Sequence, residues 1–424
     1  MRWKVWSWRE DGEQVKAVVT RRCAVSEGVR GQVAEILDAV RRDGDRAVME
    51  FTRKYDGVSY ERGGEMRVEL RRAFSGARLE RAARYALRNI ERFARRQRPR
   101  SWVMRNEEGA EVGESYHPLE RVGIYVPGGA APLISTALMT VGVARAAGVR
   151  EIVVMTPPPV SGDLQAALAL AGATEVYGVG GAQAVGAMAF GTETVRAVDK
   201  VCGPGNAYVV EAKRQVMGWV AVDQLPGPSE IAVLADDGAR VDWVAADVLA
   251  QAEHGHGSQV LVVGVGEGIF GQLFDEMERQ WVDLKRREYL LETLERGALF
   301  VRVGSVDEGV EVVERYAPEH LSLQVRGAGR LARQIRNAGA IFVGGFSAVA
   351  AGDYVAGPSH TLPTGGAARM FAGLTVMDFM KRTSVVRYDR GAIEKVSGVI
   401  EALALAEGLD AHAASVRVRG GCKL

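Results

Sequence analysis

The chain contains few cysteines and few histidines. Of its 424 residues, 3 are Cys and 6 are His. Cys23, Cys202 and Cys422 are far apart, odd in number and form no CxxC pair, which argues against a disulfide framework or a cysteine-rich zinc site. We expect three reduced thiols in a cytosolic protein. Because histidines are scarce, the segments around them deserve close comparison.

Signals for export, membrane insertion and nucleic-acid binding are also lacking. Residues 1–14 are charged and have no apolar core, so we expect no signal peptide. No uncharged apolar run is long enough to span a bilayer. The 54 Lys and Arg balance 53 Asp and Glu, and no long basic block predicts a nucleic-acid partner. The composition is that of an ordinary globular enzyme, which we expect to be soluble and cytoplasmic.

Short apolar segments alternate with helical periodicity, and this pattern predicts an α/β fold with parallel sheets. The strands expected in two successive runs are 123–126, 151–155 and 175–178, then 231–234, 260–263, 299–303, 321–325 and 340–343. The helices expected are 27–55, 76–97, 138–147, 164–171 and 241–254, and the last ~50 residues should be helical until a β-like tail at 415–419. The two runs could be two similar halves.

The usual dinucleotide-binding fingerprint, GxGxxG after a strand, is absent. The segment from Gly178 comes close but ends on Gln183, and the segment from Gly264 has Ile269 where glycine should stand. Any dinucleotide must therefore be held in another way. A serine nucleophile elbow, an HExxH helix and a Walker loop are absent too.

Two segments place candidate catalytic groups together. Gln251 and His254 are three residues apart at the end of a helix and share a face, either as a ligand pair or as a polar helix end. Glutamine is an uncommon zinc ligand. Glu319 and His320 follow Pro318 and can supply a water-activating carboxylate and a proton acceptor, although a surface turn would explain them equally well.

Further polar segments carry the same ambiguity. Asp353 and His360 lie in a Gly/Pro-rich stretch, which indicates either a site or an ordinary loop. Glu407 and His412 flank Gly408, which a helix cap followed by a new turn also explains. The turns at 203–206 and 227–230 are typical either of ligand-cradling loops or of strand–helix connections.

Taken in order, eight segments closely resemble the histidinol dehydrogenase family, over nearly the whole chain from about residue 27. They are RVGIYVPGG, GGAQAVGAMAFGTETV, DKVCGPGNAYVVEAKRQV, GPSEIAVLAD, LAQAEHG, APEHL, GDYVAGPSHTLPTGG and LAEGLDAH. Two stretches depart from the family: residues 345–350 lack the usual TPE-like residues, and the first 26 residues match poorly. Neither departure removes a chemical group named above.

The resemblance implies specific site residues. It implies one zinc ion held by Gln251, His254, Asp353 and His412, and NAD contacts at Tyr125, Gln183 and Asn206. It implies substrate contacts at Ser229, His320, His360 and Glu407, beside the four metal ligands.

The family reaction implied is the two-step oxidation of L-histidinol through L-histidinal to L-histidine, with each hydride passed to NAD. Zinc has no redox chemistry and would hold the substrate. Our hypothesis is that His320 accepts the alcohol proton and that Glu319 activates water for attack on the aldehyde.

The resemblance also implies an α/β fold of two incomplete Rossmann-like domains with small helical N- and C-terminal segments, in an intertwined homodimer. Glu407 and His412 would then act in the partner's active site. The boundaries expected are 1–26 for an N-terminal segment, 27–120 with 230–373 for the first domain, 121–229 for the second and 374–424 for a C-terminal segment.

Three other functions remain open from the sequence. A dehydrogenase of the same family acting on another small alcohol, such as a sulfopropanediol, would conflict with the carboxylate of Glu407, which would repel a sulfonate. A zinc hydrolase lacks its usual motif. A non-catalytic metal or nucleotide binder would have no need of Glu319 and His320 together.

Overall fold

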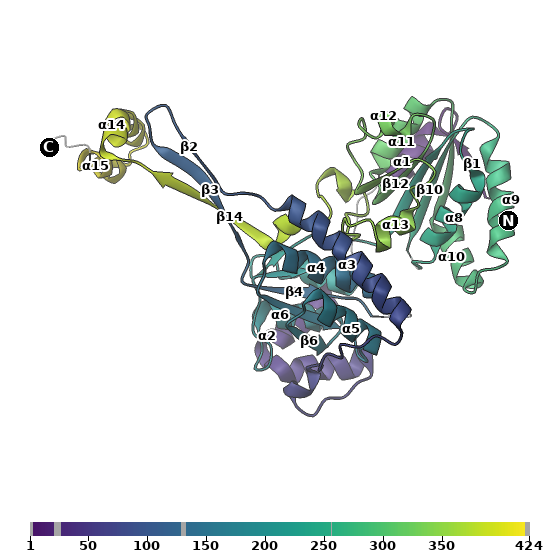
Figure 1. Ribbon diagram of the computed structural model, residues 1–424, viewed down its shortest axis with the longest axis horizontal. Helices are drawn as coiled ribbons and strands as arrows, with labels where there is room; N and C mark the ends of the chain where they lie inside the picture. The colour runs from purple at the N-terminus through teal and green to yellow at the C-terminus, as the bar shows by residue number, and fades with distance from the viewer. Residues whose placement is uncertain (1–2, 21–26, 129–132, 256, 420–424) are drawn as a thin grey trace.

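The computed structural model describes residues 3–20, 27–128, 133–255 and 257–419. It contains two α/β bodies and a long antiparallel arm that extends away from them (Figure 1). Among the described residues, no helix combines the length and apolar character needed to cross a bilayer.

The first α/β body is built on a five-stranded parallel sheet in the order β6-β5-β4-β7-β8. Its strands are β4 (Arg121–Tyr125), β5 (Glu151–Thr156), β6 (Glu175–Gly178), β7 (Lys200–Cys202) and β8 (Ala221–Val222). Its helices are α2 (Glu27–Asp56, broken at Gly44), α3 (Ala77–Gln97), α4 (Ile134–Ala147), α5 (Gly162–Ala171), α6 (Gly181–Phe190) and α7 (Ala207–Gln215), with the 3-10 turn η1 (Gly63–Met66).

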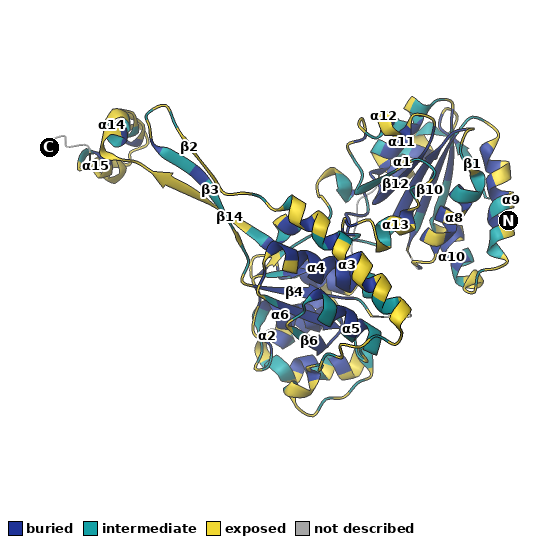
Figure 2. Cartoon of the chain, viewed as in Figure 1, coloured by how far each residue is buried: buried dark blue, intermediate teal, exposed yellow. Residues whose placement is uncertain are grey.

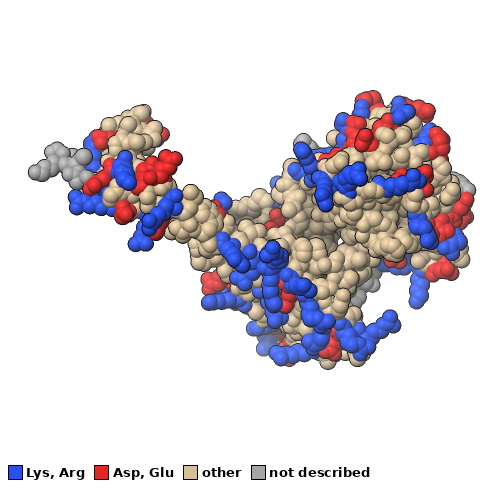
Figure 3. All heavy atoms as spheres, turned by 45° about the horizontal axis from the view of Figure 1, so that its top comes forward, with Lys and Arg blue, Asp and Glu red and all other residues tan. Residues whose placement is uncertain are grey.

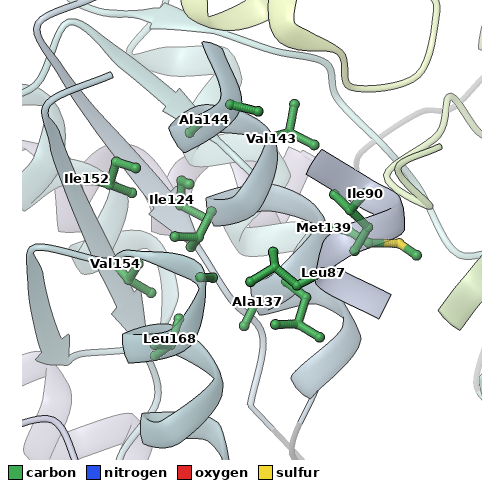
Figure 4. Close-up of a cluster of buried hydrophobic side chains, with 14 of the residues drawn as sticks. Leu87, Ile90, Ile124, Ala137, Met139, Val143, Ala144, Ile152, Val154 and Leu168 are labelled. Carbon is green, nitrogen blue, oxygen red and sulfur yellow. The ribbon is translucent and has the colours of Figure 1, made fainter. Parts of the chain in front are cut away.

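Helices cover both faces of this sheet. Ile152 and Val154 of β5 point to a core with α3, α4 and α5 (Figure 4), whereas Val153 and Met155 point to a core with α2, α6 and α7. Strands buried on both faces explain why β4 and β5 are continuous apolar runs in the sequence. Residues 27–97 therefore pack on the five-stranded sheet, which differs from the expected grouping of 27–120 with 230–373.

The helix α3 shows how amphipathic spacing fixes this packing. Ala83, Leu87 and Ile90 recur at helical spacing and are buried against α4. The opposite face is exposed and carries arginines, including Arg81 and Arg88. On the face shown in Figure 3, Lys and Arg side chains gather over the first α/β body, although the net charge of the whole chain is only +1.

The second α/β body is built on a six-stranded parallel sheet in the order β1-β11-β10-β9-β12-β13. Its strands are β1 (Val5–Ser7), β9 (Glu230–Ala235), β10 (Gln259–Val265), β11 (Ala298–Val303), β12 (His320–Gln324) and β13 (Ala340–Val343). Its helices are α1 (Gly12–Val19), α8 (Val241–Ala252), α9 (Ile269–Trp281), α10 (Arg287–Gly297), α11 (Val306–Tyr316), α12 (Ala328–Leu331) and α13 (Val349–Tyr354). The 3-10 turn η2 (Ala367–Arg369) follows, and the next turn η3 (Val376–Phe379) packs on α3 and α4 of the first body.

The two sheets share one strand order. In each, the first strand (β4 or β9) is central, the next two lie on one side, and the last two lie on the other. This is a doubly wound order, and it places a reversal point between β4 and β7 and another between β9 and β12. The shared topology agrees with the suggestion that the two runs are similar halves, with β1 added at an edge.

The arm is a three-stranded antiparallel sheet that ends in two helices. Its strands are β2 (Trp102–Arg105), β3 (Glu111–Pro118) and β14 (Met380–Arg387), and its helices are α14 (Arg390–Ala406) and α15 (Asp410–Arg417). In Figure 1 these helices lie at the far end of the arm, and Figure 2 shows the arm to be largely exposed. The predicted β-like tail at 415–419 is wrong, because Ala413 and Val416 share a helical face that is buried within the arm.

Candidate functional site

Glu319 and His320 enter the second body at the amino end of β12. Helix α11 ends at Tyr316 and is followed by Ala317, whose φ of 49° is unusual for a residue with a side chain. This turn directs the chain through Pro318 into β12, beside the amino end of β9. Both side chains are buried. The candidate catalytic pair thus lies opposite to the carboxyl edge at which doubly wound sheets usually bind ligands.

The carboxylate of Glu319 is desolvated but hydrogen-bonded. Its Oε2 accepts hydrogen bonds from Ser229 Oγ and from the backbone N of Glu230, both at 2.8 Å. Burial raises the pKa of Glu319 to about 7, although the two hydrogen bonds and the nearby His320 favour the charged form. A carboxyl group with this pKa can both take up and release a proton near neutral pH.

The hydrogen bonding of His320 fixes which ring nitrogen can act as a base. Its Nδ1 lies 3.1 Å from the carbonyl oxygen of Glu230. Because a carbonyl can only accept, Nδ1 carries the proton in the neutral ring and Nε2 keeps its lone pair. Nε2 lies 3.7 Å from Asp353 Oδ1, and Nδ1 lies 3.5 Å from Glu319 Oε2. The free lone pair therefore points toward Asp353.

Helix α8 and the turn after it bring Gln251 and His254 to the same place. Gln251 is buried, and its Nε2 donates to Ser229 Oγ at 3.1 Å, which extends the network to Glu319. This leaves the amide oxygen as the atom able to bind a cation. Desolvation by the surrounding groups lowers the pKa of His254, opposed by the nearby Asp353, so the imidazole is favoured in the neutral form that metals bind. Gln251, His254 and Asp353 thus belong to one cluster.

His360 links this cluster to the first α/β body. Its Nδ1 lies 3.1 Å from the carbonyl oxygen of Asp353, and its Nε2 lies 3.1 Å from Thr136 Oγ1 in the first turn of α4. Burial lowers the pKa of His360, so the neutral ring donates to Asp353 and accepts from Thr136. The site therefore lies where the two bodies meet. No pattern in the sequence points to Thr136 as a site residue.

Glu407 and His412 are the two predicted site residues that one chain does not bring to the cluster. Glu407 directly follows α14 and His412 lies in α15; both are exposed, and the two helices lie on the arm (Figure 1). Within the part of the chain that the structure describes, no three His, Cys, Asp or Glu side chains are arranged to hold a metal ion. A single chain therefore presents three of the four predicted zinc ligands together, and one of those is a glutamine.

The predicted NAD contacts lie around the carboxyl ends of the strands of the first body, the edge at which α4 also begins. Tyr125 ends β4, Gln183 lies in the first turn of α6, and Asn206 caps α7. Tyr125 is buried, which raises its pKa to about 12, and its hydroxyl oxygen accepts a hydrogen bond from Gly181 N at 3.1 Å. Among the described residues, neither side-chain amide atom of the buried Gln183 has a hydrogen-bond partner. Such an amide group is available to a ligand.

Comparisons with known proteins find one family over nearly the whole chain. A family model described as "Histidinol dehydrogenase" matches residues 19–420. The chain is 43% identical to the histidinol dehydrogenase of Moorella thermoacetica over 417 residues, covering 96% of this chain and 98% of that protein. It is 43% identical to the enzyme of Aquifex aeolicus over 412 residues, covering 96% of each.

Solved structures show the same relationship. The histidinol dehydrogenase of Elizabethkingia anophelis superposes with a TM-score of 0.90 at 35% identity, covering 96% of this chain and 95% of that one. An acetylating aldehyde dehydrogenase from Geobacillus thermoglucosidasius matches with a TM-score of 0.51 at 14% identity, which shows a related fold alone.

Proposed function

The chain belongs to the histidinol dehydrogenase family, and we propose that it oxidises L-histidinol through L-histidinal to L-histidine in the cytoplasm, with NAD as the oxidant. This is an oxidoreductase reaction of histidine biosynthesis. The observation that carries the proposal is the buried pair Glu319 and His320 beside Gln251, His254 and Asp353.

The two oxidations require different groups from the chain. In the first, His320 Nε2 takes the hydroxyl proton of the substrate as the carbon gives up a hydride. In the second, Glu319 takes a proton from the water that forms the new carbon–oxygen bond at the aldehyde. Its pKa of about 7 suits this role, because a large fraction of the group is a carboxylate at neutral pH. Ser229 holds that carboxylate in place.

The side chains present fit a zinc ion. Gln251, His254 and Asp353 offer an amide oxygen, a neutral imidazole and a carboxylate, and His412 would complete a four-ligand set. When bound, the ion supplies an anchor for the imidazole and amine of histidinol and polarises the reacting oxygen. Ser229, His320, His360 and Glu407 would contact the substrate around it.

The first body fits the cofactor. Its reversal point between β4 and β7 is where doubly wound sheets bind dinucleotides. Tyr125, Gln183 and Asn206 surround this edge, and the unpartnered amide of Gln183 would gain a hydrogen-bond partner there. The contact of Thr136 with His360 joins the first turn of α4 to the catalytic cluster. Each α/β body would then act as an incomplete Rossmann-like domain, one for cofactor and one for substrate.

The arm supports an intertwined homodimer. Its terminal helices expose apolar side chains, including Val399, Leu403 and Leu405, and a second copy that packed on them would remove this apolar surface from water. The same helices carry Glu407 and His412. A partner chain would therefore both cover the apolar surface and complete the active site, so the two residues would act across the dimer.

One assay tests this function. Purified protein with zinc, NAD and L-histidinol should form about two NADH for each histidinol consumed, as two successive oxidations require. A sulfopropanediol serves as the control substrate and should give none. Formation of a single NADH per histidinol would mean that the aldehyde step is missing, and formation of none would contradict the proposal.

A further inference from the structure

A tight loop connects β7 to α7 at the carboxyl edge of the first body. It begins at Gly203, whose φ of 110° disfavours any residue with a side chain. A Cβ atom at this position would lie 2.2 Å from the carbonyl oxygen of Tyr125. The loop is therefore held against the end of β4, and it leads to Asn206, whose side-chain oxygen accepts hydrogen bonds from Tyr208 N and Val209 N.

A buried ion pair binds both backbone polar groups of Gly203. Asp223 Oδ2 accepts the backbone N–H of Gly203 at 2.8 Å, and Lys213 Nζ donates to its carbonyl oxygen at 2.9 Å. Lys213 and Asp223 also form a salt bridge with each other, with 0% and 2% of their side chains exposed. Lys213 comes from α7 and Asp223 follows β8, so elements on both sides of the loop hold one residue.

Stabilisation of the fold is a poor explanation for the buried pair of Lys213 and Asp223. Removing two charges from water costs several kcal/mol per ion, and well-packed apolar residues often replace a buried pair at no loss. The pair instead fixes the backbone conformation of the loop, because it holds the orientation of one peptide group on each side of Gly203. The site that adjoins this loop is the proposed cofactor edge, with Tyr125 in direct contact.

We infer that Lys213 and Asp223 are positioning residues for the dinucleotide, which hold the loop 203–206 in the shape that receives it. The inference rests on the proposed cofactor edge. Neither side chain reaches the ligand, since both are buried beneath the loop. Their effect is on the affinity for NAD, through the conformation of Gly203 and Asn206, and not on the proton chemistry at Glu319 and His320.

The test compares a double variant of the ion pair with a control variant at Lys200. Lys200 begins β7, whereas the ion pair holds Gly203, which follows the other end of β7. Lys213→Met with Asp223→Leu removes both charges together, so that neither is left buried alone. The control is Lys200→Met, which removes the Lys200–Asp378 pair at the amino end of β7. NAD affinity is measured by isothermal titration calorimetry, steady-state constants are measured with histidinol, and backbone hydrogen exchange is followed in both proteins.

The double variant should bind NAD at least about tenfold more weakly, a change of about 1.4 kcal/mol. Its KM for NAD should rise by a similar factor. Its kcat and its KM for histidinol should stay within about twofold of the parent's values. Amides of 203–206 should exchange faster while those of β4 and β5 stay protected, and the control should match the parent. Unchanged NAD affinity would overturn the inference, as would equally faster exchange throughout the sheet. Absence of NAD binding in the parent, where the pair is intact, would overturn the proposed function and this inference with it.

Discussion

Glu319 is the residue whose environment bears most directly on rate. Its pKa is raised to about 7, so the reactive carboxylate form grows as the pH rises through that value. We predict that the rate of histidinal oxidation increases from pH 6 to pH 8 in proportion to this form. A pH–rate profile measured with histidinal as substrate would show an inflection near pH 7.

The substitution Glu319→Gln should remove this inflection, because the amide does not titrate. It should slow histidinal oxidation by about 10²-fold or more, the range for loss of a general base, and slow the first oxidation less. Stopped-flow traces with each substrate separate the two steps. Glu311→Gln, on the exposed side of α11, is the matched control. Equal loss in both steps would refute the water-activating role.

His254 is the residue that most directly tests the metal. Loss of this imidazole should weaken zinc binding by at least about tenfold, the lower bound seen when even a supporting residue of a metal site is lost. Zinc content after dialysis against a chelator, measured by atomic absorption, checks this for His254→Ala. His117→Ala, an exposed histidine of β3, should keep the parent's zinc content. If both variants retain zinc equally, His254 is no ligand.

The residues of the site could be predicted only in part. The sequence shows which residue types are able to act as acids, bases or ligands, but it does not show which of them come into contact in the fold. Glu319 and His320 are neighbours in sequence, and their burial in the structure argues against the surface turn that the sequence left open. The network from Gln251 through Ser229 to Glu319 joins three separate segments, and no local pattern reveals it. Thr136 is a helical threonine like any other, and only its contact with His360 distinguishes it.

Among the elements, the first parallel sheet depends on a charged network at the amino end of β4. Arg121 is buried and donates to Glu151 and Glu175 at 2.6 Å. The pKa of Glu175 is lowered to about 2, chiefly by its hydrogen bonds from Arg121. Arg121→Met would leave both carboxylates without this partner, far from the cofactor edge.

We predict that Arg121→Met lowers the free energy of unfolding by about 2–4 kcal/mol, in the range for a broken, partly buried pair. Urea denaturation gives the value. The control Arg95→Met breaks an exposed pair with Glu91 in α3 and should cost less than about 1 kcal/mol. NAD affinity should be unchanged in both. A loss for Arg121→Met no larger than the control's would contradict the prediction.

Most strands of the two parallel sheets were predicted from the sequence, whereas the strands of the arm were not. The strands β5 and β10 are continuous apolar runs because both of their faces are covered. The arm strands are largely exposed, so β2 and β14 lack that signal. The tail was misread because the alternation from Ser415 to Arg419 resembles a strand, whereas the spacing of Ala413 and Val416 fits a helix.

At the scale of the whole molecule, two inactive variants test whether the arm carries His412 into the active site of a partner chain. His320→Ala and His412→Ala should each be inactive alone. In a mixed dimer, one site would combine the intact His320 of one chain with the intact His412 of the other. Random mixing after joint refolding should therefore restore about a quarter of the parent's activity.

Size-exclusion chromatography of differently tagged chains identifies the mixed dimer, and its NADH formation is then measured. The control pairs His320→Ala with Glu319→Gln, two changes in the same site, which should restore nothing beyond the Glu319→Gln homodimer's own activity. If the first pair also restores nothing, His412 does not act across the dimer.

The arm's strands are made at different times during translation, so its sheet is completed late in synthesis. Strand β3 pairs with β14, and their partners Glu111 and Arg387 are 276 residues apart. From the synthesis of β3 until that of β14, while most of both α/β bodies is translated, one edge of β3 stays unpaired and open to pairing with other nascent chains. Translation must run almost to completion before that edge is covered. A polysome carrying many such chains would be the place where this protein is most vulnerable to aggregation.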